Sequence, residues 1–132
     1  MTPTPAFALS LPARAASVTV VRHVLGGVLG VWPVSQELLD DVQIAVTEAC
    51  ANVVTHAYLD LPPGTVDVTG DVVDERVVIA VRDHGRGIVP RTDSPGLGMG
   101  LPLIAALTEH LWTGLLDDGV HEVRMTFPKD PA

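Results

Sequence analysis

The stretch EACANVVTHAY, residues 48–58, decides how the rest of the chain is interpreted. It is largely apolar and helical in character, yet it carries Glu48, Asn52 and His56 at intervals of four residues. Four residues advance an α-helix by slightly more than one turn, so the three polar groups form one stripe. A carboxylate next to an amide suits two tasks, accepting a proton and ligating Mg²⁺. The stripe alone also fits a helix edge exposed to water, so other motifs must decide.

The composition is that of a globular, acidic chain. Of its 132 residues, 47% are hydrophobic and 18% are charged, which predicts a single domain over residues 1–132 with an extended lead-in over 1–14. The net charge of −8 argues against nucleic acid as a direct partner, because phosphates demand a basic surface. It does not argue against a nucleotide, which backbone N–H groups and a metal ion can hold.

The compartment is inferred from targeting signals and cysteine usage. The N-terminus lacks a basic region followed by a sustained apolar run, and no stretch is long enough to span a membrane. The single cysteine, Cys50, lies among apolar neighbours and cannot form an internal disulfide. We therefore expect a cytoplasmic protein without a membrane segment, in which Cys50 is a small core residue.

Hydrophobic periodicity predicts two helices, a hairpin, a glycine-rich loop over 84–100, a third helix and a second hairpin. Helices are expected over 18–32 between an N-cap at Ser17 and a stop at Pro33, from Ser35 to the LPPG turn, and over 101–112. Strands are expected over 6–11, 65–73, 76–83, 112–116 and 121–127. This order predicts an α+β fold, a mainly antiparallel sheet with helices on one face.

The first predicted helix contains three glycines, Gly26, Gly27 and Gly30. Each glycine costs about 1 kcal/mol relative to alanine inside a helix. We therefore expect close packing against a neighbouring element to compensate at these positions.

A second motif is VVIAVRDHGRGI, residues 77–88, in which Asp83 ends a buried strand directly before Gly85 and Gly87. A carboxylate in this position can accept a hydrogen bond from an exocyclic amine of the kind that adenine presents. The glycines let the backbone approach a base and adopt positive φ. An ordinary turn after a strand is the alternative.

A third motif is SPGLGMGLPLI, residues 94–104, with Gly96, Gly98 and Gly100 leading into a helix. Free N–H groups and the dipole at a helix N-terminus favour a phosphate chain. The motif is not a Walker sequence, because Gly-Lys-Ser/Thr is absent, and no βαβ unit surrounds it. A flexible loop at a helix entry is the alternative.

The order of the three motifs is more specific than any one of them. Glu-x-x-x-Asn on a helix, then strand-Asp-x-Gly-x-Gly, then Gly-x-Gly-x-Gly opening a helix resembles the N, G1 and G2 boxes of the GHKL ATPase superfamily, which has the Bergerat ATP-binding fold. Within that superfamily the chain resembles the anti-sigma-factor serine-protein kinases over roughly residues 15–127. That family binds ATP and Mg²⁺, holds a sigma factor inactive and phosphorylates a serine on a STAS-type antagonist protein.

The resemblance implies a role for each motif. Glu48 would be the catalytic base, Asn52 would ligate Mg²⁺, and Asp83 would bond the adenine amine. Gly85 and Gly87 would shape the base pocket. The phosphates would be surrounded by a segment of six residues, Gly96, Leu97, Gly98, Met99, Gly100 and Leu101.

The resemblance also implies partners. Arg22 on the first helix would contact the sigma factor and the antagonist, although a solvated helix residue is the alternative. The glycines of this helix resemble the face through which these kinases form homodimers.

Two departures from the family pattern leave alternatives open. The lid IVPRTDSP, residues 88–95, is short, and Arg91 is its only basic residue. His121 stands about where the family has a hydroxyl that orders the nucleotide site. The main hypothesis is therefore a serine kinase that is also an anti-sigma factor. The alternatives are an ATP-binding regulatory module without useful turnover and a related switch kinase inside a signalling complex.

Overall fold

The computed structural model describes residues 6–32, 34–87 and 97–128, and in the first three residues of the last range it describes the backbone only. In chain order the elements are β1 (Phe7–Pro12), α1 (Ala15–Leu29), α2 (Gln36–Asn52), the π-helix η1 (Val53–Ala57), β2 (Thr65–Val73), β3 (Arg76–Asp83), α3 (Leu97–Leu107), β4 (His110–Leu115) and β5 (His121–Thr126). The predicted α+β class is confirmed.

The strands form one five-stranded sheet in the order β1-β2-β3-β5-β4, and every neighbouring pair is antiparallel. The predicted hairpin turn is confirmed at Asp74 and Glu75, which both have positive φ (51° and 66°) between the paired residues Val73 and Arg76. Two consecutive positive φ values give a turn whose twist matches that of the strands. Pairing of β3 with β5 sets Asp83 opposite His121.

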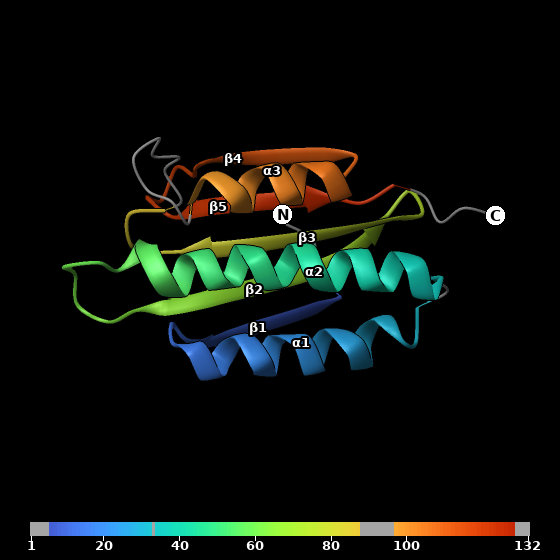
Figure 1. Cartoon of the computed structure of the whole chain (residues 1–132), viewed down its shortest axis with the longest axis horizontal. Helices are drawn as coiled ribbons and strands as arrows, with labels where there is room; N and C mark the ends of the chain where they lie inside the picture. The colour runs from blue at the N-terminus through green and yellow to red at the C-terminus, as the bar shows by residue number, and fades with distance from the viewer. Residues whose placement is uncertain (1–5, 33, 88–96, 129–132) are drawn as a thin grey trace.

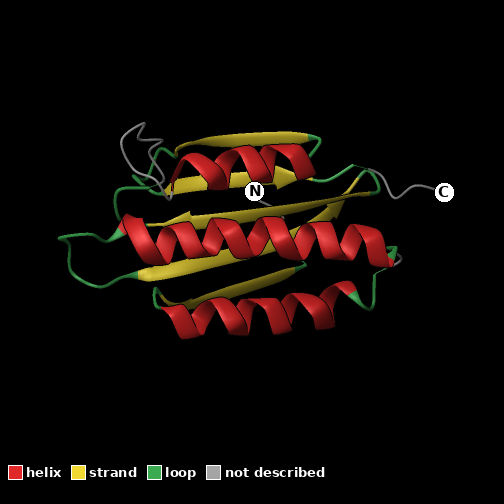
Figure 2. Cartoon of the chain, viewed as in Figure 1, coloured by secondary structure: helices red, strands yellow, loops and turns green. Residues whose placement is uncertain are grey.

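The helices lie side by side on one face of the sheet, with α2 between α1 and α3 (Figure 1). Figure 2 shows the same two layers, helices in front of strands. The buried core lies between the layers and consists mainly of Val, Leu and Ala, as the low aromatic content requires. The central position of α2 brings its C-terminal end close to the ends of β2 and β3, where the candidate site lies.

Helix α2 forms where its periodicity predicts it. The side chain of Ser35 accepts a hydrogen bond of 3.1 Å from the N–H of Leu38, which confirms the predicted N-cap, and Glu37 lies in the first turn where the helix dipole favours a negative charge. Its buried positions recur at helical spacing and are Leu38, Val42, Ala45, Val46, Ala49, Cys50 and Asn52.

The predicted bounds of the first helix are wrong at both ends. Arg14 is the N-cap, and Ser17 lies buried inside the helix, because the chain turns directly from β1 into α1. The helix ends at Leu29, with Gly30 as its C-cap, before the proline. The close packing expected at the glycines is confirmed at Gly26, where an added Cβ would lie 3.2 Å from Gln43 Nε2. At Gly27, nothing in the described residues beyond the local helix backbone comes within 4 Å of such a Cβ.

The predicted bounds of the third helix are also wrong. Helix α3 begins four residues earlier than expected, at Leu97, and ends at Leu107, so the glycine-rich stretch before Leu101 is helical. The hydroxyl of Thr108 donates to the carbonyl of Ile104 at 3.0 Å, and Glu109 N–H then bonds Thr126 O. Residues 110–112, which hydrophobic periodicity placed in the helix, therefore belong to β4, where they pair with β5.

Candidate functional site

The last turns of α2 carry the two residues predicted to act on phosphates. Glu48 is half-buried, and Asn52 is only 5% exposed at the C-terminal end of the helix. The chain then widens into the π-helix η1, which contains His56, so the α-helical spacing of the stripe ends at Asn52. Single π-turns inside helices are often found at functional sites, where they change the direction of the backbone.

The loop that follows β3 is hydrogen-bonded to the end of η1. The N–H of Arg86 donates to the carbonyl of Ala57 at 2.7 Å. A Cβ on Gly85 would lie 2.2 Å from that same oxygen, so only glycine allows this approach. The hydroxyl of Tyr58 donates to Thr65 O at 2.6 Å and accepts from His84 N–H at 3.0 Å. These contacts fix the predicted adenine-binding loop against the helix that carries Glu48 and Asn52.

Asp83 is buried, with 3% of its surface exposed, at the end of β3. Its Oδ1 accepts two backbone hydrogen bonds, from Gly85 N–H at 3.0 Å and from Gly87 N–H at 3.1 Å, and Gly87 has φ +72°. Oδ2 accepts no hydrogen bond from the described residues. Burial raises the pKa of Asp83, and the two N–H donors oppose that rise. With respect to the described residues, the carboxyl group thus keeps Oδ2 available as an acceptor.

The first turn of α3 meets Asn52. A Cβ on Gly100 would lie 2.6 Å from Asn52 Nδ2 and 3.3 Å from its Oδ1, so glycine is required for this contact. Asn52 Nδ2 is buried and has no hydrogen-bond partner among the described residues. Gly98 lies in the same helical turn, and Leu101 packs against the core.

Parts of the predicted phosphate segment and the whole predicted lid lie outside the described residues. The side chains of Leu97 and Met99 lie outside the described residues, as do Gly96, Arg91 and the rest of 88–96. In the described part of the site, Gly100 meets Asn52, one turn after Glu48 on α2, and the loop that follows Asp83 is bonded to the end of η1.

The donor set fits Mg²⁺ held together with a nucleotide. The described residues contain no group of three or more His, Cys, Asp or Glu side chains able to hold a metal ion. Mg²⁺ commonly binds through one or two protein oxygens together with water and substrate phosphates. The buried and unpaired amide of Asn52 is a suitable protein ligand of this kind. Amide nitrogen and oxygen are assigned from surrounding hydrogen bonds, so either end of this unpaired amide can present its oxygen.

A cavity of about 220 Å³ lies where β3 and β4 end and β5 begins. Its lining includes Asp83 and His121, which face each other in the sheet register. Thr113 and Leu115 of β4 form part of another wall.

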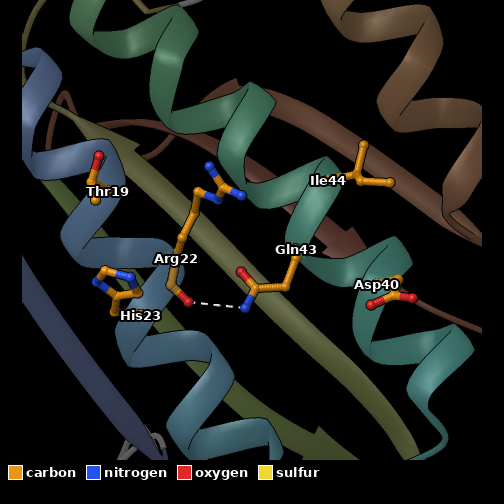
Figure 3. A pocket seen from close by; sticks show the side chains of 6 residues that line it. All are labelled: Thr19, Arg22, His23, Asp40, Gln43 and Ile44. Carbon is orange, nitrogen blue, oxygen red and sulfur yellow. Dashed lines mark hydrogen bonds between the residues drawn. The ribbon is translucent and has the colours of Figure 1, made fainter.

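A groove between α1 and α2 extends from Arg22, the predicted partner-binding residue, to Glu48, the predicted catalytic base. One cavity of about 590 Å³ is lined by six residues, Thr19, Arg22, His23, Asp40, Gln43 and Ile44, drawn in Figure 3. An adjoining cavity of about 230 Å³ shares Arg22 and Gln43 and includes Glu48. Arg22 is exposed and extends between the two helices (Figure 3).

Two groove residues were missed by sequence reasoning. Gln43 Nε2 donates to Arg22 O at 2.9 Å, but Gln43 Oε1 is buried without a partner among the described residues. The same is true of Thr47 Oγ1, one turn further along α2. Gln43 and Thr47 are four residues apart on α2, and Thr47 directly precedes Glu48, which was the available signal.

The fold and the joined motifs define a class, an ATPase domain of the histidine kinase-like type. A model of the family described as "Histidine kinase-like ATPase domain" matches residues 11–127, and the chain belongs to this family. The predicted resemblance to the GHKL superfamily is thereby confirmed.

No helix in the described part of the chain combines the length and apolar character needed to cross a membrane.

Curated relatives of the chain within this family are serine-protein kinases. The chain is similar to serine-protein kinase RsbW of Bacillus velezensis, at 38% identity over 58% of this chain and 48% of that protein. It is also similar to serine-protein kinase RsbW of Bacillus licheniformis, at 36% identity over 66% of this chain and 54% of that protein. The chain thus spans about half the length of the curated relatives it matches.

A solved structure agrees on the fold. The crystal structure of the RsbU and RsbW domains of a Mycobacterium tuberculosis protein superposes with a TM-score of 0.72 at 23% identity, covering 99% of this chain and 35% of that one.

Proposed function

We propose that this chain is an ATP-dependent anti-sigma factor that sequesters a sigma factor and phosphorylates a serine on an antagonist protein. ATP and Mg²⁺ are its proposed cofactors, a STAS-type antagonist its substrate, a homodimer its assembly and the cytoplasm its compartment. The observation that carries the proposal is the shared cavity of Arg22 and Glu48, one helical turn from the buried Asn52, whose Nδ2 has no partner among the described residues. Similarity to serine-protein kinases named RsbW supports it.

In this proposal each described side chain has a separate task. Asp83 Oδ2 accepts a hydrogen bond from the amine of adenine, while Gly85 and Gly87 hold its Oδ1. Asn52 supplies the amide oxygen for Mg²⁺, which would neutralise the phosphates. Glu48 accepts the proton of the serine hydroxyl. Positioning and electrostatic stabilisation supply most of the catalysis in phosphoryl transfer, so this separation of tasks is sufficient.

The groove between α1 and α2 is the proposed entry for the antagonist. Arg22 lies in both cavities of the groove, and Glu48 lies at its inner end. A segment that carries serine and follows this groove would lie against Gln43 and Thr47, which line the cavity that contains Glu48. Arg22 would bind an acidic group on the partner.

The test is transfer of labelled phosphate from ATP, with Mg²⁺, to antagonist proteins encoded by the same organism, run beside calorimetric ATP binding. We expect Glu48→Gln to keep ATP affinity and to abolish transfer. Glu37→Gln is the matched control, since it makes the same change at an exposed position on the same helix and should leave transfer intact.

Two other outcomes would contradict the proposal. Transfer at the wild-type rate by Glu48→Gln would remove the base from the mechanism. ATP binding by the wild type without transfer to any antagonist would leave a regulatory module and no kinase.

A further inference from the structure

His121 is the first residue of β5 and stands opposite Asp83 in the β3–β5 ladder. Gly87 touches both side chains. Its N–H donates to Asp83 Oδ1 at 3.1 Å, and a Cβ added to it would lie 2.5 Å from Cγ and from Nδ1 of the His121 ring. The imidazole and the carboxyl group are therefore brought together around one glycine.

Both side chains line the cavity of about 220 Å³ at the end of the sheet. The described residues provide no hydrogen bond to Asp83 Oδ2 and none to the His121 ring. Whole drug-sized ligands occupy cavities of roughly 300–1,000 Å³, so this smaller space suits one part of a ligand, such as a planar base. Its lining also includes Thr113 and Glu122, whose carboxylate accepts from Arg124. The polar pair formed by Asp83 and His121 combines an acceptor with an imidazole, whose neutral form carries one N–H donor.

The Watson–Crick edge of adenine has the matching pattern, because the N6 amine is a donor and the neighbouring N1 is an acceptor. The corresponding edge of guanine has the opposite pattern, with an acceptor at O6 and a donor at N1. We propose that His121 donates a ring N–H to N1 of adenine while Asp83 accepts from N6, which makes His121 a specificity-determining residue for adenine nucleotides. This inference rests on the proposed function, in which ATP occupies this site.

The contact explains why a histidine can occupy a position where a small hydroxyl residue was expected. A hydroxyl side chain is short, whereas the imidazole extends across Gly87, which has no side chain to block it. The loop after β3 reaches this position because its backbone is bonded to Asp83 and to Ala57. Replacing His121 should therefore change recognition of the base more than the arrangement of the loop.

The test is calorimetric binding of ATP and of 1-deaza-ATP, in which a C–H group replaces N1, each with Mg²⁺. We expect the wild type to bind ATP about tenfold more tightly than 1-deaza-ATP, the order of one hydrogen bond to an otherwise unpaired group. His121→Ala should lose this ratio by binding ATP more weakly while its affinity for 1-deaza-ATP is unchanged. His121→Gln, which keeps an N–H donor, should recover part of the ratio.

The control is His84→Ala, which removes a neighbouring histidine whose ring contacts Asp67 at 3.2 Å and should leave the ratio unchanged. A wild type that binds both nucleotides equally would overturn the role of His121 while leaving ATP binding in place. The same conclusion follows if His121→Ala, folded by circular dichroism, keeps the wild-type ratio. A wild type that binds neither nucleotide would overturn the proposed function itself, and this inference with it.

Discussion

Substituting Gly85 by alanine should destabilise the protein because of one contact. The new Cβ would lie 2.2 Å from the carbonyl oxygen of Ala57 and 2.8 Å from its carbonyl carbon. These are backbone atoms, so the clash cannot be relieved by rotating a side chain. The loop must move away from η1, and this movement breaks the 2.7 Å hydrogen bond from Arg86 N–H to Ala57 O.

The magnitude follows from the two effects. Overpacking of this kind costs about 1–3 kcal/mol, and loss of a hydrogen bond adds about 1 kcal/mol. The expected loss in the free energy of unfolding is therefore about 2–4 kcal/mol. An unfolding entropy of about 2.1 cal/mol/K per residue over 132 residues makes 1 kcal/mol equivalent to about 4 °C in Tm. Gly85→Ala should thus lower the Tm by about 8–16 °C.

Gly27→Ala is the matched control, because it makes the same chemical change where, among the described residues, nothing beyond the local helix backbone lies within 4 Å of the new Cβ. Inside α1, alanine is favoured over glycine by about 0.5–1 kcal/mol, so the Tm should rise by about 2–4 °C. Thermal unfolding followed by circular dichroism at two protein concentrations measures both effects and separates any contribution from subunit association. Equal Tm values for Gly85→Ala and the wild type would refute the reasoning.

The remaining predictions concern the cap, the cysteine and the buried carboxyl group. Ser35→Ala should lower the free energy of urea unfolding by about 1 kcal/mol, because Leu38 N–H loses its partner, and an unchanged midpoint would contradict this. Burial raises the pKa of Cys50 to about 12, so a thiol reagent should label it at pH 8 only after unfolding, and rapid labelling of the native chain would show that the thiol is accessible. Because burial raises the pKa of Asp83 above its ordinary 3.8, its contribution to stability is fully present below that value and is lost as pH rises through the folded pKa. Urea unfolding should therefore show the wild type losing stability relative to Asp83→Asn as pH rises, and a constant difference would contradict the shift.

The elements governed by local patterns could be predicted from the sequence. The repeat of apolar residues and the cap at Ser35 determine α2, and alternation around Asp74 and Glu75 determines the β2–β3 hairpin. The order of the polar and glycine motifs was sufficient to recognise the family before any contact was known.

The features that depend on contacts between distant residues could not be predicted. Helix α3 includes glycines with poor helix propensity because its first turn packs on Asn52, and Trp112 joins a strand because β4 pairs with β5. The π-helix has no local signature, and the spacing of Gln43 and Thr47 indicates only that they share one face of α2.

The central claim is that the buried Asp83 carboxyl group forms part of an ATP site. The most direct test compares calorimetric binding of ATP with Mg²⁺ to the wild type and to Asp83→Asn, with unfolding curves of both. In the variant the side-chain oxygen can still accept from Gly85 and Gly87, but the free acceptor is replaced by an N–H₂ donor that faces the adenine amine. We predict that the wild type binds ATP and that Asp83→Asn stays folded and loses that binding. Absence of binding by the wild type, or equal binding by a folded Asp83→Asn, would contradict the account.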